Sequence, residues 1–72
     1  MSPRATAVLP ALRYWRTQRA LKQTELAEAA SVHWTTVQRI ERGQPAEVET
    51  MRRLADALEV KPADLMGQPP AD

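Results

Sequence analysis

Residues 23–43 read QTELAEAASVHWTTVQRIERG and decide the fold of this chain. Apolar residues recur in this stretch with the spacing of two short helices, at about 24–30 and 34–42. Between them, the small and polar residues around Ser31 favour a tight turn. Gly43 suits the left-handed conformation in which many helices end. The stretch therefore predicts two short helices, a turn between them and a stop at Gly43.

The second of these predicted helices has two different faces. Val37, Ile40 and Glu41 fall on one side. The other side carries four polar or cationic residues at i, i+3, i+4 and i+7 spacing, namely Thr35, Gln38, Arg39 and Arg42. A short helix with an apolar back and a cationic front can place that front against base edges in the major groove of DNA, which is about 12 Å wide. A helix-turn-helix that reads DNA is therefore our first hypothesis.

Length and composition exclude several classes of protein. The chain has 72 residues, which fit one domain with a modest core. It contains no cysteine and a single histidine, so we expect no disulfide and no metal site. No catalytic constellation and no glycine-rich phosphate loop is present, so we expect neither an enzyme nor a bound cofactor. No apolar run reaches about 18 residues, which favours a soluble, cytoplasmic protein away from membranes.

The charges are unevenly distributed along the chain. Residues 1–42 contain seven Lys or Arg against three Asp or Glu, a net charge of +4. Residues 43–72 contain three against six, a net charge of −3, and the whole chain has a net charge of +1. A basic half suits a face that meets phosphate, and an acidic half suits a face toward water or a partner. Uneven solvated charge without function is the alternative.

Five helices are predicted, and no alternating pattern typical of a strand is present. The predicted ranges are about 10–19, 24–30, 34–42, 49–58 and 62–66. We therefore expect an all-α fold, with one compact five-helix domain over 10–67, a loose N-terminal arm at 1–9 and a frayed tail at 68–72. The apolar stripes predict one core, formed by Leu12, Trp15, Leu21, Leu26, Ala27, Ala30, Val32, Val37, Ile40, Met51, Leu54, Leu58, Val60 and Leu65.

A string of residues running through most of the chain matches a known family. It consists of Leu12, Arg13, Arg16, Leu21, Gln23, Glu25, Leu26, Ala27, Val32, Thr36, Val37, Arg39, Ile40, Glu41, Arg42, Gly43, Pro45, Thr50, Met51, Leu54, Ala55, Ala57, Leu58, Val60 and Leu65. On these residues the chain resembles the helix-turn-helix family of the phage repressors and Cro, also called the xenobiotic-response-element family. The resemblance implies a repressor-like fold of five helices, in which helices 2 and 3 form the helix-turn-helix. It also implies that the third helix enters the major groove, usually as part of a two-fold dimer.

The resemblance assigns the reading of bases to Trp34, Thr35, Gln38 and Arg39. The chemistry of these side chains agrees with that role. Arg39 can form a bidentate pair with guanine and Gln38 with adenine, each worth about 1–3 kcal/mol of discrimination. Thr35 can touch a thymine methyl or bond a base edge. Trp34 is open to three interpretations: a contact with DNA, a contact with a partner protein, or folding back on the domain.

Four further residues are candidates for phosphate binding. The resemblance implies this role for Gln23, at the start of the second helix, where the unpaired N–H groups favour an anion. Lys22 stands where the family usually has a serine cap, and it can reach phosphate instead. Arg42 lies nearest the end of the third helix. His33 replaces the usual Ser or Thr cap and can cap weakly, touch phosphate when protonated, or do neither.

Two positions are predicted to be structural. The resemblance pairs Arg16 with Glu41 as an ion pair between the first and third helices, and removing one partner of a buried pair can cost about 3–5 kcal/mol. Ser31 stands where the family usually has glycine. If the turn needs a positive φ there, serine adds strain of about 1–2 kcal/mol.

Two functions remain open. The first is a sequence-specific regulator of transcription, expected to be a homodimeric repressor, with a dimer contact formed by Val60, Ala63, Leu65 and Met66. The second is an antitoxin or adaptor whose main role is to bind a partner protein such as a toxin. Trp34 and the acidic C-terminal half leave room for that role. Glu47 and Glu49 repel phosphate, so we expect no contact between their loop and the minor groove.

Overall fold

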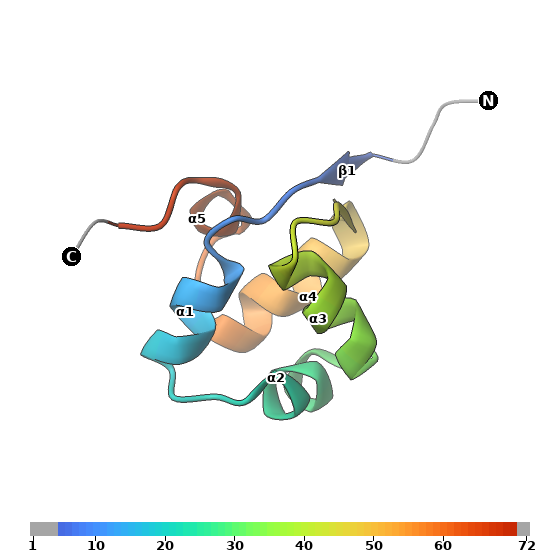
Figure 1. Ribbon diagram of the computed structural model, residues 1–72, viewed down its shortest axis with the longest axis vertical. Coiled ribbons are helices and arrows are strands. Elements are labelled where there is room, and N and C mark those ends of the chain that lie inside the picture. Colours follow the sequence, from blue (N-terminus) through green and yellow to red (C-terminus); the bar gives the residue numbers. More distant parts are fainter. Residues whose placement is uncertain (1–4, 71–72) are drawn as a thin grey trace.

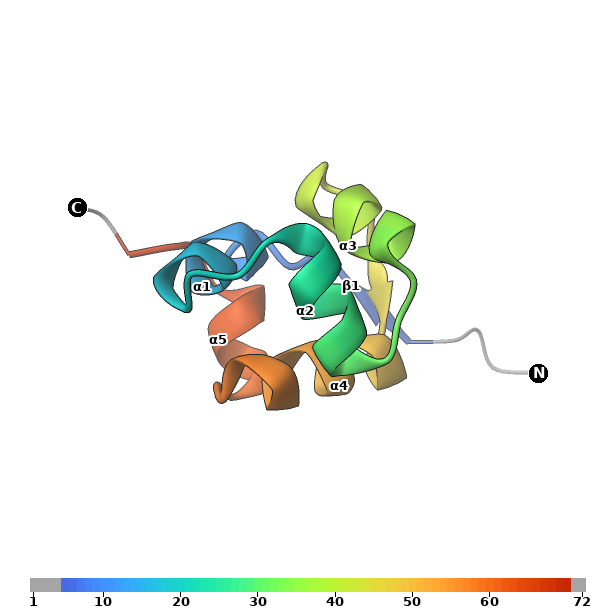
Figure 2. The ribbon, with the colours of Figure 1, turned by 90° about the horizontal axis from the view of Figure 1, so that it is seen from below.

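Five helices form most of the structure, as predicted. The computed structural model describes residues 5–70 of the chain. Its helices are α1 (Leu12–Gln18), α2 (Gln23–Ala30), α3 (Trp34–Glu41), α4 (Val48–Leu58) and α5 (Pro62–Met66) (Figure 1). The helices α3 and α4 lie on opposite outer sides of the molecule, as Figure 2 shows. No helix in residues 5–70 has the length and apolar character needed to cross a membrane.

The start of α2 is capped from inside the helix. Lys22 precedes the helix, and its ammonium group has no lone pair with which to cap the first N–H groups. The Glu25 carboxylate instead accepts a hydrogen bond from the backbone N–H of Lys22 at 2.8 Å. A negative side chain in the first turn also suits the helix dipole. The loss of the usual serine cap is therefore partly offset.

The turn between α2 and α3 has a left-handed residue at its first position. Ser31 has φ 57° and ψ 43°, so the positive φ considered in the sequence analysis is present. Arg53 of α4 supports this turn by donating a hydrogen bond to the Ser31 carbonyl oxygen at 3.3 Å. After α3, Gly43 has φ 103°, the conformation that the sequence predicted for it.

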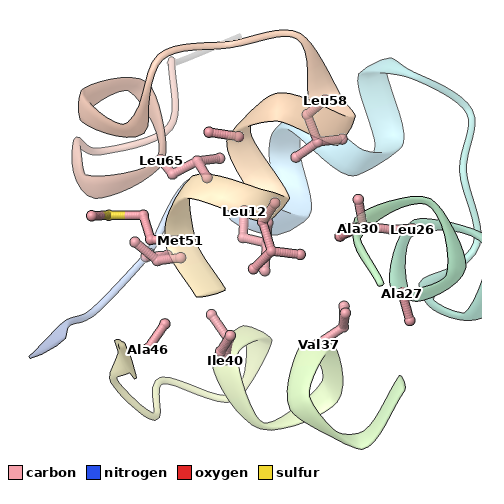
Figure 3. Close-up of a cluster of buried hydrophobic side chains, with 13 residues drawn as sticks. Leu12, Leu26, Ala27, Ala30, Val37, Ile40, Ala46, Met51, Leu58 and Leu65 are labelled. Carbon is pink, nitrogen blue, oxygen red and sulfur yellow. The ribbon is translucent and has the colours of Figure 1, made fainter. Parts of the chain in front are cut away.

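One apolar cluster joins all five helices (Figure 3). Its buried members lie on the inner faces of the helices and on the segments beside them: Leu9, Leu12, Leu26, Ala27, Ala30, Val37, Ile40, Ala46, Met51, Leu54, Ala55, Leu58 and Leu65. Four predicted core residues, Trp15, Leu21, Val32 and Val60, are partly buried and pack at its edge. Leu9 and Ala46 were not predicted, because each lies outside any periodic apolar stripe.

The N-terminal segment differs from its prediction. Strand β1 (Thr6–Ala7) pairs antiparallel with strand β2 (Ala46–Glu47), whereas the sequence predicted no strand and a loose arm at 1–9. Leu9, which follows β1, is 1% exposed. Two-residue strands are too short to show an alternating pattern, so no periodicity signals them. The expectation of a loose arm is wrong for residues 5–9, and residues 1–4 lie outside the described part of the chain.

The predicted dimer contact also needs one correction. Leu65 is fully buried, so it packs in the core and is not available to a second chain. Backbone hydrogen bonding places it there, because the N–H of Ala11 donates to the Leu65 carbonyl oxygen at 3.2 Å. The indole N–H of Trp15 donates to the neighbouring carbonyl of Asp64 at 3.3 Å. Met66, the next residue of α5, is 43% exposed.

We expect Leu9→Ala to lower the free energy of unfolding by about 3 kcal/mol, because it leaves a cavity beside α1 and α4. Its exposed neighbour provides a matched control, since Val8 is 48% exposed and Val8→Ala should cost less than about 0.5 kcal/mol. Urea titrations of the two variants measure the difference. Equal midpoints for both would show that the N-terminal segment does not complete the core.

Ser31→Gly should raise the free energy of unfolding by about 0.5–1 kcal/mol. Relief of about 1–2 kcal/mol of left-handed strain exceeds the extra entropy of glycine in the unfolded chain, which is about 0.5–1 kcal/mol. The control is Ala29→Gly at an exposed position inside α2, which should lower stability by about 1 kcal/mol. A loss of stability in Ser31→Gly would contradict the left-handed turn.

Candidate nucleic-acid interface

Helix α3 turns one side to the core and the other outward. Val37 and Ile40 are 0% and 3% exposed and anchor the helix from behind. The predicted base-reading residues lie on the outer side or at the first turn: Trp34 and Arg39 are exposed, and Thr35 and Gln38 are half-buried. The protein covers none of the four completely. The arrangement therefore presents them together on one surface.

The start of α3 is capped by a histidine. The backbone N–H of Thr35 donates to Nδ1 of His33 at 3.2 Å, and the Thr35 hydroxyl lies 2.7 Å from the same nitrogen. The His33 ring stacks on Trp34 with a centroid separation of 6.3 Å and an interplanar angle of 25°. Of the three interpretations of His33, the structure shows the cap. Trp34 keeps 42% of its surface exposed despite the stacking.

The end of α3 is held by a charged network. Arg16 of α1 donates from Nε to Oε2 of Glu41 at 2.5 Å and from Nη2 to Oε1 at 2.9 Å. The third nitrogen of the guanidinium, Nη1, donates to the Leu21 carbonyl at 2.8 Å. The amide of Gln23 donates to Oε1 of Glu41 at 3.1 Å. One carboxylate in α3 thereby receives hydrogen bonds from α1 and α2.

This network is shielded from water. The side chains of Arg16 and Glu41 are only 13% and 6% exposed. The hydrogen bond to Glu41 and the negative charge of that carboxylate raise the pKa of Arg16, although burial acts in the opposite direction. A raised pKa on a cation stabilises the folded state at every pH below the ordinary arginine value. The contribution of Arg16 is therefore constant across neutral pH and is lost only in strong alkali.

The four predicted phosphate-binding residues lie at helix ends. Lys22 and Gln23 are at the start of α2, His33 caps α3, and Arg42 follows α3. Lys22, His33 and Arg42 are exposed, and Gln23 is half-buried because its amide bonds Glu41. Gln23 uses one of its two amide hydrogens in that bond, so the other hydrogen remains for a ligand.

A hollow beside Arg39 was not predicted from the sequence. It has a volume of about 350 Å³ and lies where the end of α3, the following loop and the start of α4 meet. Its walls are Thr36, Arg39, Ile40, Gln44, Pro45, Ala46, Glu47 and Thr50. The hollow depends on how the loop is held against β1, and no sequence motif signals that pairing. Within residues 5–70, no group of His, Cys, Asp or Glu is arranged to hold a metal ion.

Comparison with known proteins identifies the family. A family model described as helix-turn-helix matches residues 12–65. The chain belongs to the Cro/C1-type helix-turn-helix family. A search of curated proteins gives no match.

Two solved structures resemble this Cro/C1-type domain. One is the restriction-modification controller protein C.AhdI from Aeromonas hydrophila, at 33% identity and a TM-score of 0.72, covering 75% of this chain and 83% of that one. The other is a hypothetical transcription factor, NHTF, from Neisseria, at 28% identity and a TM-score of 0.73, covering 82% of this chain and 66% of that one. The Cro/C1-type family binds double-stranded DNA, so this protein is a DNA-binding regulator of transcription.

We expect Arg16→Ala and Glu41→Ala each to lower the free energy of unfolding by about 3 kcal/mol, because each strands a shielded charge. The double variant Arg16→Met with Glu41→Leu should lower the free energy of unfolding by less than the sum of the losses in the two alanine variants. Urea titrations of the variants measure these costs.

The matched control is an exposed ion pair in the same protein. Arg53 bonds Glu49 at 3.3 Å, with side chains 50% and 67% exposed, so Glu49→Ala should cost no more than about 1 kcal/mol. Equal losses for Glu41→Ala and Glu49→Ala would show that the Arg16 pair does not hold α3.

Proposed function

We propose that this protein is a sequence-specific repressor that places α3 in the major groove of double-stranded DNA. The observation that carries the proposal is the division of α3. Val37 and Ile40 are buried behind it, while the polar residues of the other side face outward from a fixed backbone. Figure 2 shows α3 at the outside of the molecule, where a groove can receive it.

Two of the proposed base-reading side chains have hydrogen-bonding groups that make no contact within the described residues. Within the described residues, the guanidinium of Arg39 has no hydrogen bond or ion pair, so all its donors are available to guanine O6 and N7. The Gln38 amide is likewise uncommitted and suits adenine N6 and N7. Trp34 lies one turn before Gln38 and offers an apolar surface to a thymine methyl or a sugar.

Phosphate contacts would hold this helix in the groove. Lys22 and Gln23 lie at the N-terminus of α2, where unpaired N–H groups attract an anion. Arg42 follows the end of α3 that Gln23 contacts through Glu41, so these residues would meet the backbone beside the same end of the reading helix. Glu41 orients the Gln23 amide through their hydrogen bond. The cap uses Nδ1 of His33, so Nε2 is the ring nitrogen left to meet a phosphate oxygen.

A homodimer would double this interface. Because Leu65 is buried, the proposed dimer contact consists of Val60, Ala63 and Met66. Met66 is among the most exposed large apolar side chains of the described residues. Two copies related by a two-fold axis would read half-sites about one helical turn apart. Occupation of such a site near a promoter suits repression. The likeness to a restriction-modification controller protein supports control of transcription.

A partner-binding role is the second candidate, because Trp34 is exposed on the same helix. In an antitoxin or adaptor, the indole would contact a protein such as a toxin. Two substitutions distinguish partner binding from DNA binding. Trp34→Ala should weaken a protein complex strongly, whereas Arg39→Ala should chiefly weaken binding to DNA.

Selection of bound sequences from a random duplex pool tests the main proposal. We expect the protein to enrich a near-palindromic site, and Arg39→Ala to lower the preference for guanine at one position per half-site by about 5- to 150-fold, following the loss of about 1–3 kcal/mol. Gln38→Ala should act in the same way at an adenine. Thermal midpoints of both variants should match the parent protein, because the two side chains support no other residue.

The control for lost charge is Arg52→Ala, because Arg52 is an exposed arginine of α4, and this helix lies on the opposite side of the molecule from α3. It should leave every base preference unchanged. Equal effects of Arg52→Ala and Arg39→Ala on base preference would mean that the outer side of α3 does not read the bases. If no sequence is enriched and the product of a neighbouring gene co-elutes in a stable complex, partner binding is the main role.

A further inference from the structure

The side chain of Thr35 makes a contact that limits what it can offer to DNA. Both its backbone nitrogen and its hydroxyl oxygen lie within hydrogen-bond distance of one atom, Nδ1 of His33, at 3.2 and 2.7 Å. Thr35 belongs to the first turn of α3 and is half-buried. His33 therefore acts on a residue of the proposed reading surface as well as on the backbone.

The backbone contact determines which nitrogen of the ring carries the proton. A backbone N–H can only donate, so Nδ1 must present its lone pair to Thr35. A proton on Nδ1 would point at the N–H hydrogen and abolish the cap. The neutral His33 ring is therefore protonated on Nε2.

The short contact to the hydroxyl then has one direction. Because Nδ1 carries no hydrogen, the Thr35 hydroxyl must donate in the 2.7 Å contact. A hydroxyl has one hydrogen and two lone pairs. Once its hydrogen is directed at His33, the oxygen of Thr35 can only accept a hydrogen bond from DNA.

This restriction limits which bases Thr35 can bond in the major groove. Adenine and cytosine present an amino group there, whereas guanine and thymine present a carbonyl oxygen. An unrestricted threonine can bond either kind of base by rotating its hydroxyl. We propose that His33 is a positioning residue that makes Thr35 an acceptor, so that α3 selects an amino-bearing base, adenine or cytosine, on the strand facing Thr35. The inference rests on the proposed insertion of α3 into the major groove.

The tautomer is tested on the free protein, without DNA. Two-bond nitrogen–proton correlation spectra of the imidazole distinguish the two neutral forms of His33. We expect the Nε2–H form in buffer that keeps the ring neutral, and the same form in Thr35→Val, because the backbone N–H of residue 35 still donates to Nδ1. An Nδ1–H ring in the parent protein would overturn the inference and leave the proposed function standing.

The base preference is tested by selection from a random duplex pool. The parent protein should enrich adenine or cytosine over guanine or thymine at one position per half-site. Thr35→Val, which keeps the shape but has no acceptor, should lower that ratio about fivefold, as expected for one hydrogen bond. His33→Ala frees the hydroxyl hydrogen and should also lower the ratio, by admitting guanine or thymine.

The matched control is His33→Asn, because an asparagine oxygen can accept from both groups of Thr35 and so retain the preference even if overall affinity changes. Circular dichroism confirms that each variant is folded at the assay temperature. Enrichment of thymine at this position by the parent protein, or an unchanged ratio in folded His33→Ala, would overturn the inference. Absence of any enriched sequence would overturn the proposed function, and the base preference with it.

Discussion

The carboxylate of Glu41 is the interaction on which the position of α3 depends. Burial of Val37 and Ile40 decides which side of the helix faces the core, but apolar contacts are non-directional and tolerate small shifts along the axis. Hydrogen bonds from Arg16 and Gln23 are directional, and they reach Glu41 from two other helices. The shielding of this group strengthens the attraction between its charges. A surface that must match the spacing of DNA bases needs such a fixed frame.

The N-terminal end of α3 is held by a contact between neighbouring residues. His33 caps the helix with a ring nitrogen in place of the hydroxyl that is usual in the family. In the tautomer that we propose, the imidazole also accepts the hydrogen of the Thr35 hydroxyl. One change of cap can thus alter both the stability of a helix and the hydrogen bonds of the residue two positions later. The rigid network at Glu41 and the cap at His33 together define the orientation of the surface.

The helices and the inner side of α3 could be predicted because their apolar spacing extends over several turns. The positive φ of Ser31 followed from a family position that usually holds glycine. The strands could not be predicted, since pairing of Thr6–Ala7 with Ala46–Glu47 depends on contacts between distant segments. Leu65 was predicted both in the core, where it lies, and in the dimer contact, because α5 has five residues, too few for a stripe to separate inner from outer positions. The roles assigned to Gln38, Arg39 and the phosphate-binding residues remain predictions.

The pairing of β1 with β2 has a practical consequence for anyone who modifies the protein. Ala46 and Glu47 form β2 and also line the hollow beside Arg39, so the N-terminal segment is physically joined to the margin of the proposed DNA surface. A bulky affinity tag or fluorophore fused ahead of β1 would sit close to that margin and strain its short ladder. A fusion beyond α5 avoids both effects but would lie beside the proposed dimer contact at Met66, so labels at the two ends would disturb different steps of DNA binding.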